Sequence, residues 1–328
     1  MPNEPLLTPS AAVFPGQYIS ADPLRLQPRS YPFRYLHPVR WSDLQDGSRM
    51  TRIAQAQFLE DLRTVLMRDV LGPDLFASGH WKAMARAVTI EHLHAGDDQS
   101  PVELAGCIEG VGNSSYSFAL AIFQRDVCLS LSKVVGVTIG SDRRPAPVPD
   151  AVRPRLAAAC WPGQPAPERP QRLGAQWHAL AAYRFRFDLP TRFSDTDAVG
   201  HINNVAVTRY HDNAWVAFQR ACLGQVTAPG EGDYWHLSRQ EVSMQGETFY
   251  PQPVTLGVTV ETIADDHFDL VQSLFQDGRC NGHQRSTVAV LDASGRATPI
   301  STALRSQLAR WQPEPTAMPA TAAQQPLP

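Results

Sequence analysis

The sequence predicts an α+β chain made of two tandem copies of one domain. Its length of 328 residues fits two domains of ordinary size. The two halves align with each other without a gap. Each half contains one long segment with a helical apolar stripe, followed by several strand-like segments. The copies are predicted over residues 31–158 and 183–310, each large enough to bury its own core.

The internal repeat has a constant offset of 152 residues, the separation of Tyr31 and Tyr183. A coincidence of composition would not keep one register over the whole length of a domain. The chain is therefore interpreted as a tandem duplication. Identities at this offset include Phe33/Phe185, Arg34/Arg186, Pro38/Pro190, Arg40/Arg192, Ser42/Ser194, Asp43/Asp195, Phe123/Phe275, Gln124/Gln276, Cys128/Cys280, Arg144/Arg296 and Leu156/Leu308.

Three segments fall outside the copies. Residues 1–30 are Pro-rich and aperiodic, which predicts a loosely packed N-terminal arm. Residues 159–182 are interpreted as the linker, because proline removes backbone donors and interrupts helices. Residues 311–328 are rich in Pro, Ala and Gln, which predicts a disordered tail.

The elements are clearest in the second copy. Residues 183–194 alternate aromatic and polar side chains, as a half-buried strand does. Residues 204–222 then carry an apolar stripe at a spacing of four, which predicts a helix, and Gly224 is placed to end it. The stripe consists of Tyr210, Ala214, Phe218 and Cys222, with Phe58, Leu62 and Leu66 on the equivalent face of the first copy.

Four strands are predicted after this helix, over residues 234–248, 254–263, 268–276 and 285–291. Asp277-Gly278 is a good hairpin turn between the last two of these strands. One long helix and about five mostly antiparallel strands per copy give the α+β class.

Composition excludes several classes of protein. The formal net charge of −3 lacks the basic excess of a nucleic-acid-binding protein. No apolar run approaches the ~20 residues of a membrane span, and the N-terminus lacks the pattern of a signal peptide. The five cysteines are scattered without C-x-x-C spacing, which favours reduced thiols in the cytoplasm over disulfides or a zinc site.

Residues 195–204 read Asp-Thr-Asp-Ala-Val-Gly-His-Ile-Asn-Asn and lie between a predicted strand and a predicted helix. Two carboxylates, a histidine and two amides at such a junction indicate a site and not a core segment. This pattern, D-x-D-x-x-G-H-x-N-N, resembles the hotdog-fold thioesterases of the 4-hydroxybenzoyl-CoA thioesterase type, within the acyl-CoA thioesterase superfamily. The resemblance implies a sheet that wraps the helix, and two fused hotdog domains that pair within the chain as a pseudo-dimer.

The resemblance also implies site residues. Asp197 matches the catalytic carboxylate, which deprotonates water or attacks the thioester. His201 is predicted to orient the carboxylate or the water, or to hydrogen-bond the thioester, and Asn204 to reach the site. Asp195 recurs as Asp43 in the other copy, which favours a structural role.

Substrate-binding roles are predicted for Gly200, Asn203 and Tyr210. Gly200 allows a close backbone approach or a positive φ. Asn203 is equally well placed to cap the following helix. The amides at a helix start can stabilise an oxyanion, but which helix does so is left open.

The first copy has lost this chemistry. At the constant offset, five motif residues of the second copy have unlike counterparts, so one site per chain is predicted. The pairs are Asp197/Gln45, Gly200/Ser48, His201/Arg49, Asn203/Thr51 and Asn204/Arg52.

The predicted function is hydrolysis of an acyl-CoA to free acid and CoA, in lipid metabolism. One alternative is an acyl-ACP thioesterase; tandem-hotdog members of that group share the Asp and the His four residues later, but place Asn where this chain has Val199. A non-catalytic acyl-thioester-binding protein is a second alternative. A hotdog dehydratase would need a differently spaced Asp/His pair, which is not found. No metal, organic cofactor or nucleic acid is expected, and a further homo-oligomer is left open.

Overall fold

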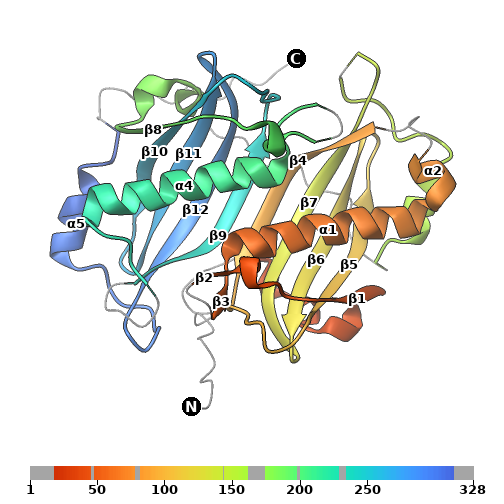
Figure 1. Ribbon diagram of the computed structural model, residues 1–328, viewed down its shortest axis with the longest axis horizontal. Helices are drawn as coiled ribbons and strands as arrows, with labels where there is room; N and C mark the ends of the chain where they lie inside the picture. The colour runs from red at the N-terminus through yellow and green to blue at the C-terminus, as the bar shows by residue number, and fades with distance from the viewer. Residues whose placement is uncertain are drawn as a thin grey trace, which may run out of the picture.

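The computed structural model describes residues 18–45, 48–77, 82–142, 144–161, 174–197, 200–228 and 234–313. Ten antiparallel strands form one continuous sheet in the order β1-β5-β6-β7-β4-β9-β12-β11-β10-β8. Two long helices, α1 and α4, lie across the same face of this sheet (Figure 1). Each half is a hotdog domain, as the sequence predicts.

One long helix and five strands recur in both halves at the same offset. The first half contains β1 (Phe33–His37), β2 (Leu44–Gln45), β3 (Arg49–Met50), α1 (Arg52–Leu71), α2 (Pro73–Ala77), β4 (Lys82–His92), β5 (Val102–Val111), β6 (Ser115–Gln124), β7 (Val127–Ile139) and α3 (Arg153–Ala158). The second half contains β8 (Phe185–Leu189), α4 (Asn204–Leu223), β9 (Tyr234–Met244), β10 (Val254–Ile263), β11 (His267–Gln276), β12 (Arg279–Leu291) and α5 (Thr302–Ala309).

The halves meet in the middle of the sheet. Strand β4 pairs with β9, from Ala87 opposite Ser243 to Glu91 opposite Arg239. Helices α1 and α4 also contact each other, and Arg52 at the start of α1 lies 2.5 Å from Asp212 of α4. The predicted intrachain pseudo-dimer around one sheet is therefore confirmed.

Each long helix buries its predicted stripe against the sheet. Phe58, Leu62 and Leu66 of α1 are at most 2% exposed, and so are Ala214 and Phe218 of α4. Complete burial of a large apolar side chain stabilises a fold by about 1.5–3 kcal/mol. These stripes therefore hold the helices on the sheet and place the helix starts near the junction of the halves.

The helix end and the hairpin turn predicted from glycine positions are both present in the structure. Gly224 ends α4 in the left-handed region, at φ +74°. Asp277 and Gly278 both have positive φ, +50° and +74°, as a two-residue hairpin turn of this kind requires.

Several strand boundaries differ from the prediction. Strand β8 covers only Phe185–Leu189 of the predicted residues 183–194, and β11 begins one residue earlier, at His267. Strand β9 ends at Met244, and β12 begins at Arg279 and not at residue 285. The first residues of β12 include Asn281, Gly282 and Gln284, which lack the apolar alternation of a strand because they lie in or beside the pocket between the halves.

The segments before each domain are better packed than the composition predicts. Residues 19–30 and 175–182 form short 3₁₀ turns. The amide of Ile19 donates to the buried carboxylate of Glu91 at 2.5 Å, and Trp177 is buried in a cluster with Tyr183 and Phe275. The described part of the arm is thus not loose. The tail beyond residue 313 lies outside the described residues.

Within the described part of the chain, no helix is both long and apolar enough to cross a membrane.

Candidate active site

The segment between β8 and α4 is anchored by Asp195. Its buried carboxylate accepts hydrogen bonds from the amide of Arg192 at 3.2 Å and from the hydroxyl of Tyr210 at 2.6 Å. Its carbonyl oxygen accepts from the amide of Asn203 at 2.9 Å. Asp43 occupies the same place in the first half and binds the amide of Arg40. Asp195 therefore holds the loop in place, which accounts for its presence in both halves.

A tight turn brings Asp197 and His201 together. The amide of Asp197 donates to the carbonyl of His201 at 2.9 Å, and the amide of Gly200 donates to the carbonyl of Asp197 at 3.0 Å. Gly200 has φ +85°, a conformation that side-chain-bearing residues rarely adopt. The glycine is thus needed for the turn.

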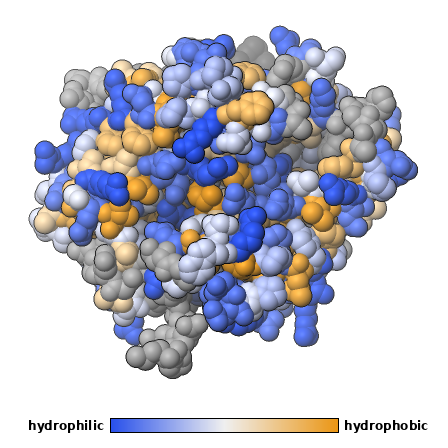
Figure 2. Space-filling model, in the orientation of Figure 1, coloured by the Kyte–Doolittle hydropathy of each residue, from blue (hydrophilic) through white to orange (hydrophobic). Residues whose placement is uncertain are grey.

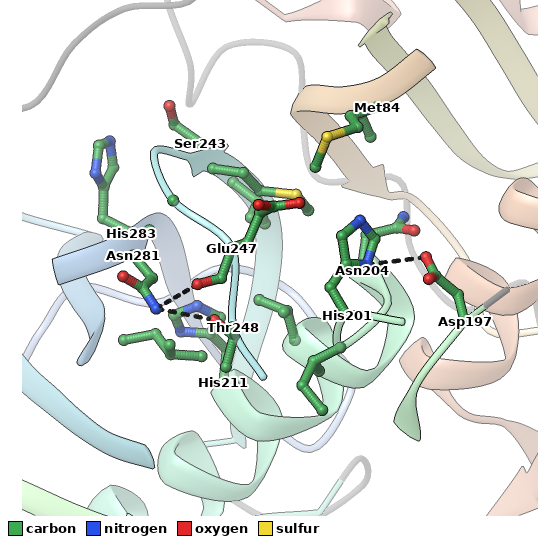
Figure 3. Close-up of a pocket in the computed structure, with 18 of the residues that line it drawn as sticks. Met84, Asp197, His201, Asn204, His211, Ser243, Glu247, Thr248, Asn281 and His283 are labelled. Atoms are coloured by element: carbon green, nitrogen blue, oxygen red, sulfur yellow. Dashed lines mark hydrogen bonds and ion pairs between the residues drawn. The ribbon is translucent and has the colours of Figure 1, made fainter. Parts of the chain in front are cut away.

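The side chains of Asp197 and His201 contact each other across this turn (Figure 3). Nδ1 of His201 lies 3.0 Å from Oδ2 of Asp197, close enough for an ion pair but not aligned for a hydrogen bond. The buried Nε2 of His201 has no hydrogen-bond partner among the described residues. The histidine can therefore hold the carboxylate with one nitrogen and offer the other to a ligand.

These two residues open into a pocket between the halves, which encloses about 790 Å³ of space that is partly open to solvent. Asn204, the first residue of α4, also lines it. The three predicted catalytic residues therefore share one pocket. Its other lining residues include Glu60, Arg63, Ala83, Met84, Ala85, Val207, His211, Val242, Ser243, Met244, Glu247, Thr248, Leu274, Asn281 and His283. Hydrophilic and hydrophobic residues are interspersed over the face that carries the two helices (Figure 2).

The three predicted substrate-binding residues do not line the pocket. The side chain of Asn203 caps α4, accepting from the amide of Ala206 at 2.8 Å. The hydroxyl of Tyr210 is bound to Asp195. Gly200 shapes the turn. The structure thus gives all three a supporting role, because their polar groups or backbone are already used inside the protein.

Helix α1 of the first half brings two charged residues into the pocket that sequence reasoning missed. Glu60 and Arg63 of α1 line the same pocket as the motif residues. Burial raises the pKa of Glu60, and the charge of Asp197 raises it further, so the two carboxylates lie near each other. The sequence feature that could have indicated these two residues is the group of charged side chains around Glu60 on the predicted helix.

The segment after β9 forms another wall. The amide of Ile202 donates to the carbonyl of Thr248 at 2.8 Å. The side chain of Asn281 donates to the carbonyl of Glu247 at 2.8 Å and to the hydroxyl of Thr248 at 3.3 Å (Figure 3). Glu247 and Asn281 were not predicted. Both are polar residues close to predicted strands, and this feature could have indicated that they line a site.

The equivalent place in the first half is filled. Arg52, the counterpart of Asn204, forms an ion pair with Asp212, the counterpart of Glu60. Trp215 and Trp235 stand where the open pocket has Arg63 and Ala83, and both are 1% exposed. Their rings pack 5.8 Å apart. Bulky indoles and an ion pair thus occupy the space that is open around Asp197.

Among the described residues, no group of three or more His, Cys, Asp or Glu side chains is placed to hold a metal ion.

Comparison with known proteins agrees with this geometry. Residues 191–311 match the model of the thioesterase-like superfamily. No curated protein matches the sequence. Among solved structures, one from Lactobacillus plantarum assigned as an oleoyl thioesterase has a TM-score of 0.63 at 14% identity, and covers 80% of this chain and 96% of that one.

Two further structures are similar over both halves. An acyl-ACP thioesterase from Bacteroides thetaiotaomicron has a TM-score of 0.60 at 14% identity, covering 78% of this chain and 97% of that one. The 12:0-ACP thioesterase from Umbellularia californica has a TM-score of 0.62 at 14% identity, covering 79% and 97%. The fold and the family match lead to one conclusion: the chain has two hotdog domains, and the second of them, over residues 191–311, matches the thioesterase-like superfamily.

Proposed function

We propose that this protein hydrolyses acyl-CoA thioesters to a free acid and CoA, at one site per chain centred on Asp197. The observation that carries the proposal is the meeting of Asp197, His201 and Asn204 in one open pocket, while the equivalent place in the other half is filled. Lipid metabolism is the setting that such a reaction fits.

Asp197 is assigned the role of general base or nucleophile. As a base it takes a proton from water, which then attacks the carbonyl carbon. In this general-base route the C–S bond then breaks, and the proton taken by Asp197 passes to the departing CoA thiolate. As a nucleophile, the Asp197 oxygen attacks the carbonyl carbon, the C–S bond breaks to release CoA, which takes up a proton, and water hydrolyses the resulting mixed anhydride to the free acid and the regenerated carboxylate. In both cases His201 holds the carboxylate in place through the 3.0 Å contact.

The start of α4 is assigned to the developing oxyanion. The amides of Ala206 and Val207 are used by Asn203, whereas those of Asn204 and Val205 lie in the first turn, where a helix provides no internal acceptor. Asn204 lines the pocket. These two amides and the helix dipole therefore favour negative charge at this end of the pocket.

The carrier is assigned to CoA because one arginine lines the pocket and a second lies near it. Arg63 lines the pocket, and Arg209 is close enough to lower the pKa of Glu60. Guanidinium groups bind phosphate well, and CoA carries several phosphates.

An acyl-ACP is the second candidate. Two of the double-hotdog structures that resemble this chain over both halves are named as ACP thioesterases. A panel of acyl-CoA thioesters, short to long and aryl, assayed for thiol release beside the same acyl groups on ACP, separates the two. We expect a higher kcat/KM with CoA. Higher values with ACP throughout would transfer the assignment to the second candidate, and no thiol release from either carrier would reject the proposal.

Replacement of His201 tests the catalytic pair. We expect His201→Ala to lower kcat on the order of 10²-fold, with a smaller change in KM, because His201 acts at the reacting centre and not on the CoA body. Steady-state kinetics check this. Arg49→Ala, at the same position of the first half, is the matched control and should behave as wild type. An unchanged kcat with a raised KM would show that His201 serves binding.

A further inference from the structure

The layer between α4 and the sheet is unusually polar for a protein core. His211 of α4 and Gln272, Gln284 and Ser286 of β11 and β12 are all 0% exposed. They are linked: the Gln272 amide group donates to the His211 carbonyl at 2.9 Å, and the Gln284 amide group donates to Gln272 at 3.0 Å and to Ser286 at 2.8 Å. Burial of such groups costs free energy unless each finds a partner.

The fold itself does not require this polarity. At the offset of 152 residues, His211, Gln272 and Ser286 correspond to Leu59, Leu120 and Val134 of the first half. These three belong to the apolar core of that half. The fourth member, Gln284, corresponds to Ser132, which is also buried and polar. Three of the four polar positions therefore accompany the open pocket and not the architecture.

Within this layer two groups lack partners. Both ring nitrogens of His211 and Oε1 of Gln284 are buried without a hydrogen bond among the described residues. His211 also lines the pocket, on the side opposite Asp197 (Figure 3). A fully buried, unpaired imidazole on the wall of an open pocket is placed to meet a ligand.

The position of His211 on α4 gives its distance from the catalytic residues. Asn204, Val207 and His211 are three and seven residues apart along one helix face, and all three line the pocket. At 1.5 Å per residue, His211 lies about 10 Å along the helix axis from Asn204. A ligand group that contacts it is therefore remote from a thioester carbon held beside Asp197.

The protonation state of His211 restricts the kind of ligand group that it can bind. Burial lowers the pKa of His211 to about 3, and the nearby His283 adds to this effect. The ring is therefore neutral at physiological pH, with one donor and one acceptor nitrogen. A neutral ring matches a hydroxyl or keto oxygen, whereas a carboxylate would need a positive charge.

We propose that the inner end of the pocket binds a neutral oxygen substituent, a hydroxyl or keto group, on the acyl chain, and that His211 selects for it. This inference rests on the proposed function, since it names the class of acyl group that the same site accepts.

The test compares octanoyl-CoA with its analogues that carry one hydroxyl at successive carbons beyond the middle of the chain. With the wild-type protein, one of the hydroxylated isomers should have a kcat/KM about 10- to 100-fold above that of octanoyl-CoA. His211→Leu, which copies Leu59 of the first half, should abolish this preference while octanoyl-CoA is hydrolysed at least as well as before. His178→Leu, an exposed histidine, is the control and should keep the preference.

The outcomes separate this inference from the proposed function. If the wild-type protein hydrolyses neither octanoyl-CoA and its hydroxylated isomers nor any other acyl-CoA of the panel described above, the proposed function fails. If it hydrolyses other acyl-CoA thioesters of that panel but none of these octanoyl compounds, the proposed function stands and the inference fails. If octanoyl-CoA and all hydroxylated isomers are hydrolysed equally well, or if His211→Leu keeps the preference, the inference alone fails. Should His211→Leu melt far below the wild type, His211→Asn replaces it; this variant keeps a neutral hydrogen-bonding group and should retain part of the preference.

Discussion

Asp197→Asn is expected to lower thioester hydrolysis by ~10²–10⁴-fold and to leave the protein folded. The amide cannot deprotonate water or attack a carbonyl, yet it has nearly the shape of the carboxylate. The side chain of Asp197 is 30% exposed, so the substitution leaves no deeply buried polar group unpaired. The backbone bonds of the turn, from the amide of Asp197 to His201 and from Gly200 to Asp197, do not involve the side chain.

Thiol-release kinetics and a melting curve check this expectation. Binding of a non-hydrolysable acyl-CoA analogue should persist, with close to one equivalent per chain. Gln45→Ala, at the position of Asp197 in the first half, is the matched control and should have the turnover of the wild type. Activity of Asp197→Asn within a few-fold of wild type would remove this carboxylate from the mechanism.

Separation of the halves is expected to abolish activity completely. A fragment of residues 174–313 retains the whole motif but loses Glu60, Arg63 and the β4 wall of the pocket. It also loses the strand that pairs with β9 from Ser243 to Arg239, so an unpaired edge and apolar surface are exposed. We expect this fragment to be inactive and to aggregate.

Expression of residues 18–161 together with this fragment is the complementary experiment. If the halves assemble as they do in the intact chain, soluble complex and thiol release should return together. Size-exclusion chromatography and the thioesterase assay measure both. A fragment of residues 174–313 that hydrolyses acyl-CoA by itself at the wild-type rate would show that the first half is dispensable.

Local features of this protein could be predicted well from its sequence. The end of α4 at Gly224 and the turn at Asp277-Gly278 depend on backbone conformations that few residues adopt. A contact between Asp197 and His201 could also be predicted, although not its geometry. Two residues that lie four positions apart across a glycine turn are close together in any tertiary context. The helix stripes were predictable for the same reason, since a period of 3.6 residues is a property of the segment itself.

The start of β12 shows where such local reasoning stops. Asn281, Gly282 and Gln284 break the apolar alternation, so the strand was predicted to begin at residue 285. Hydrogen bonds to the neighbouring strands β9 and β11 hold the segment extended from Arg279. Polar residues that serve a pocket obscure the pattern of the strand that carries them.

A duplicated α+β chain with one intact motif could be predicted from the residues alone, because register, periodicity and turn chemistry are properties of neighbouring residues. The partners of that motif could not be predicted in this way, because they come from the other half of the folded chain. Glu60 of the other half lines the same pocket as Asp197, two tryptophans fill the counterpart of the site, and His211 is buried without a hydrogen bond among the described residues. These contacts form only when the two halves pair. The pairing brings together residues that are more than a hundred positions apart in the sequence, so local patterns do not predict it.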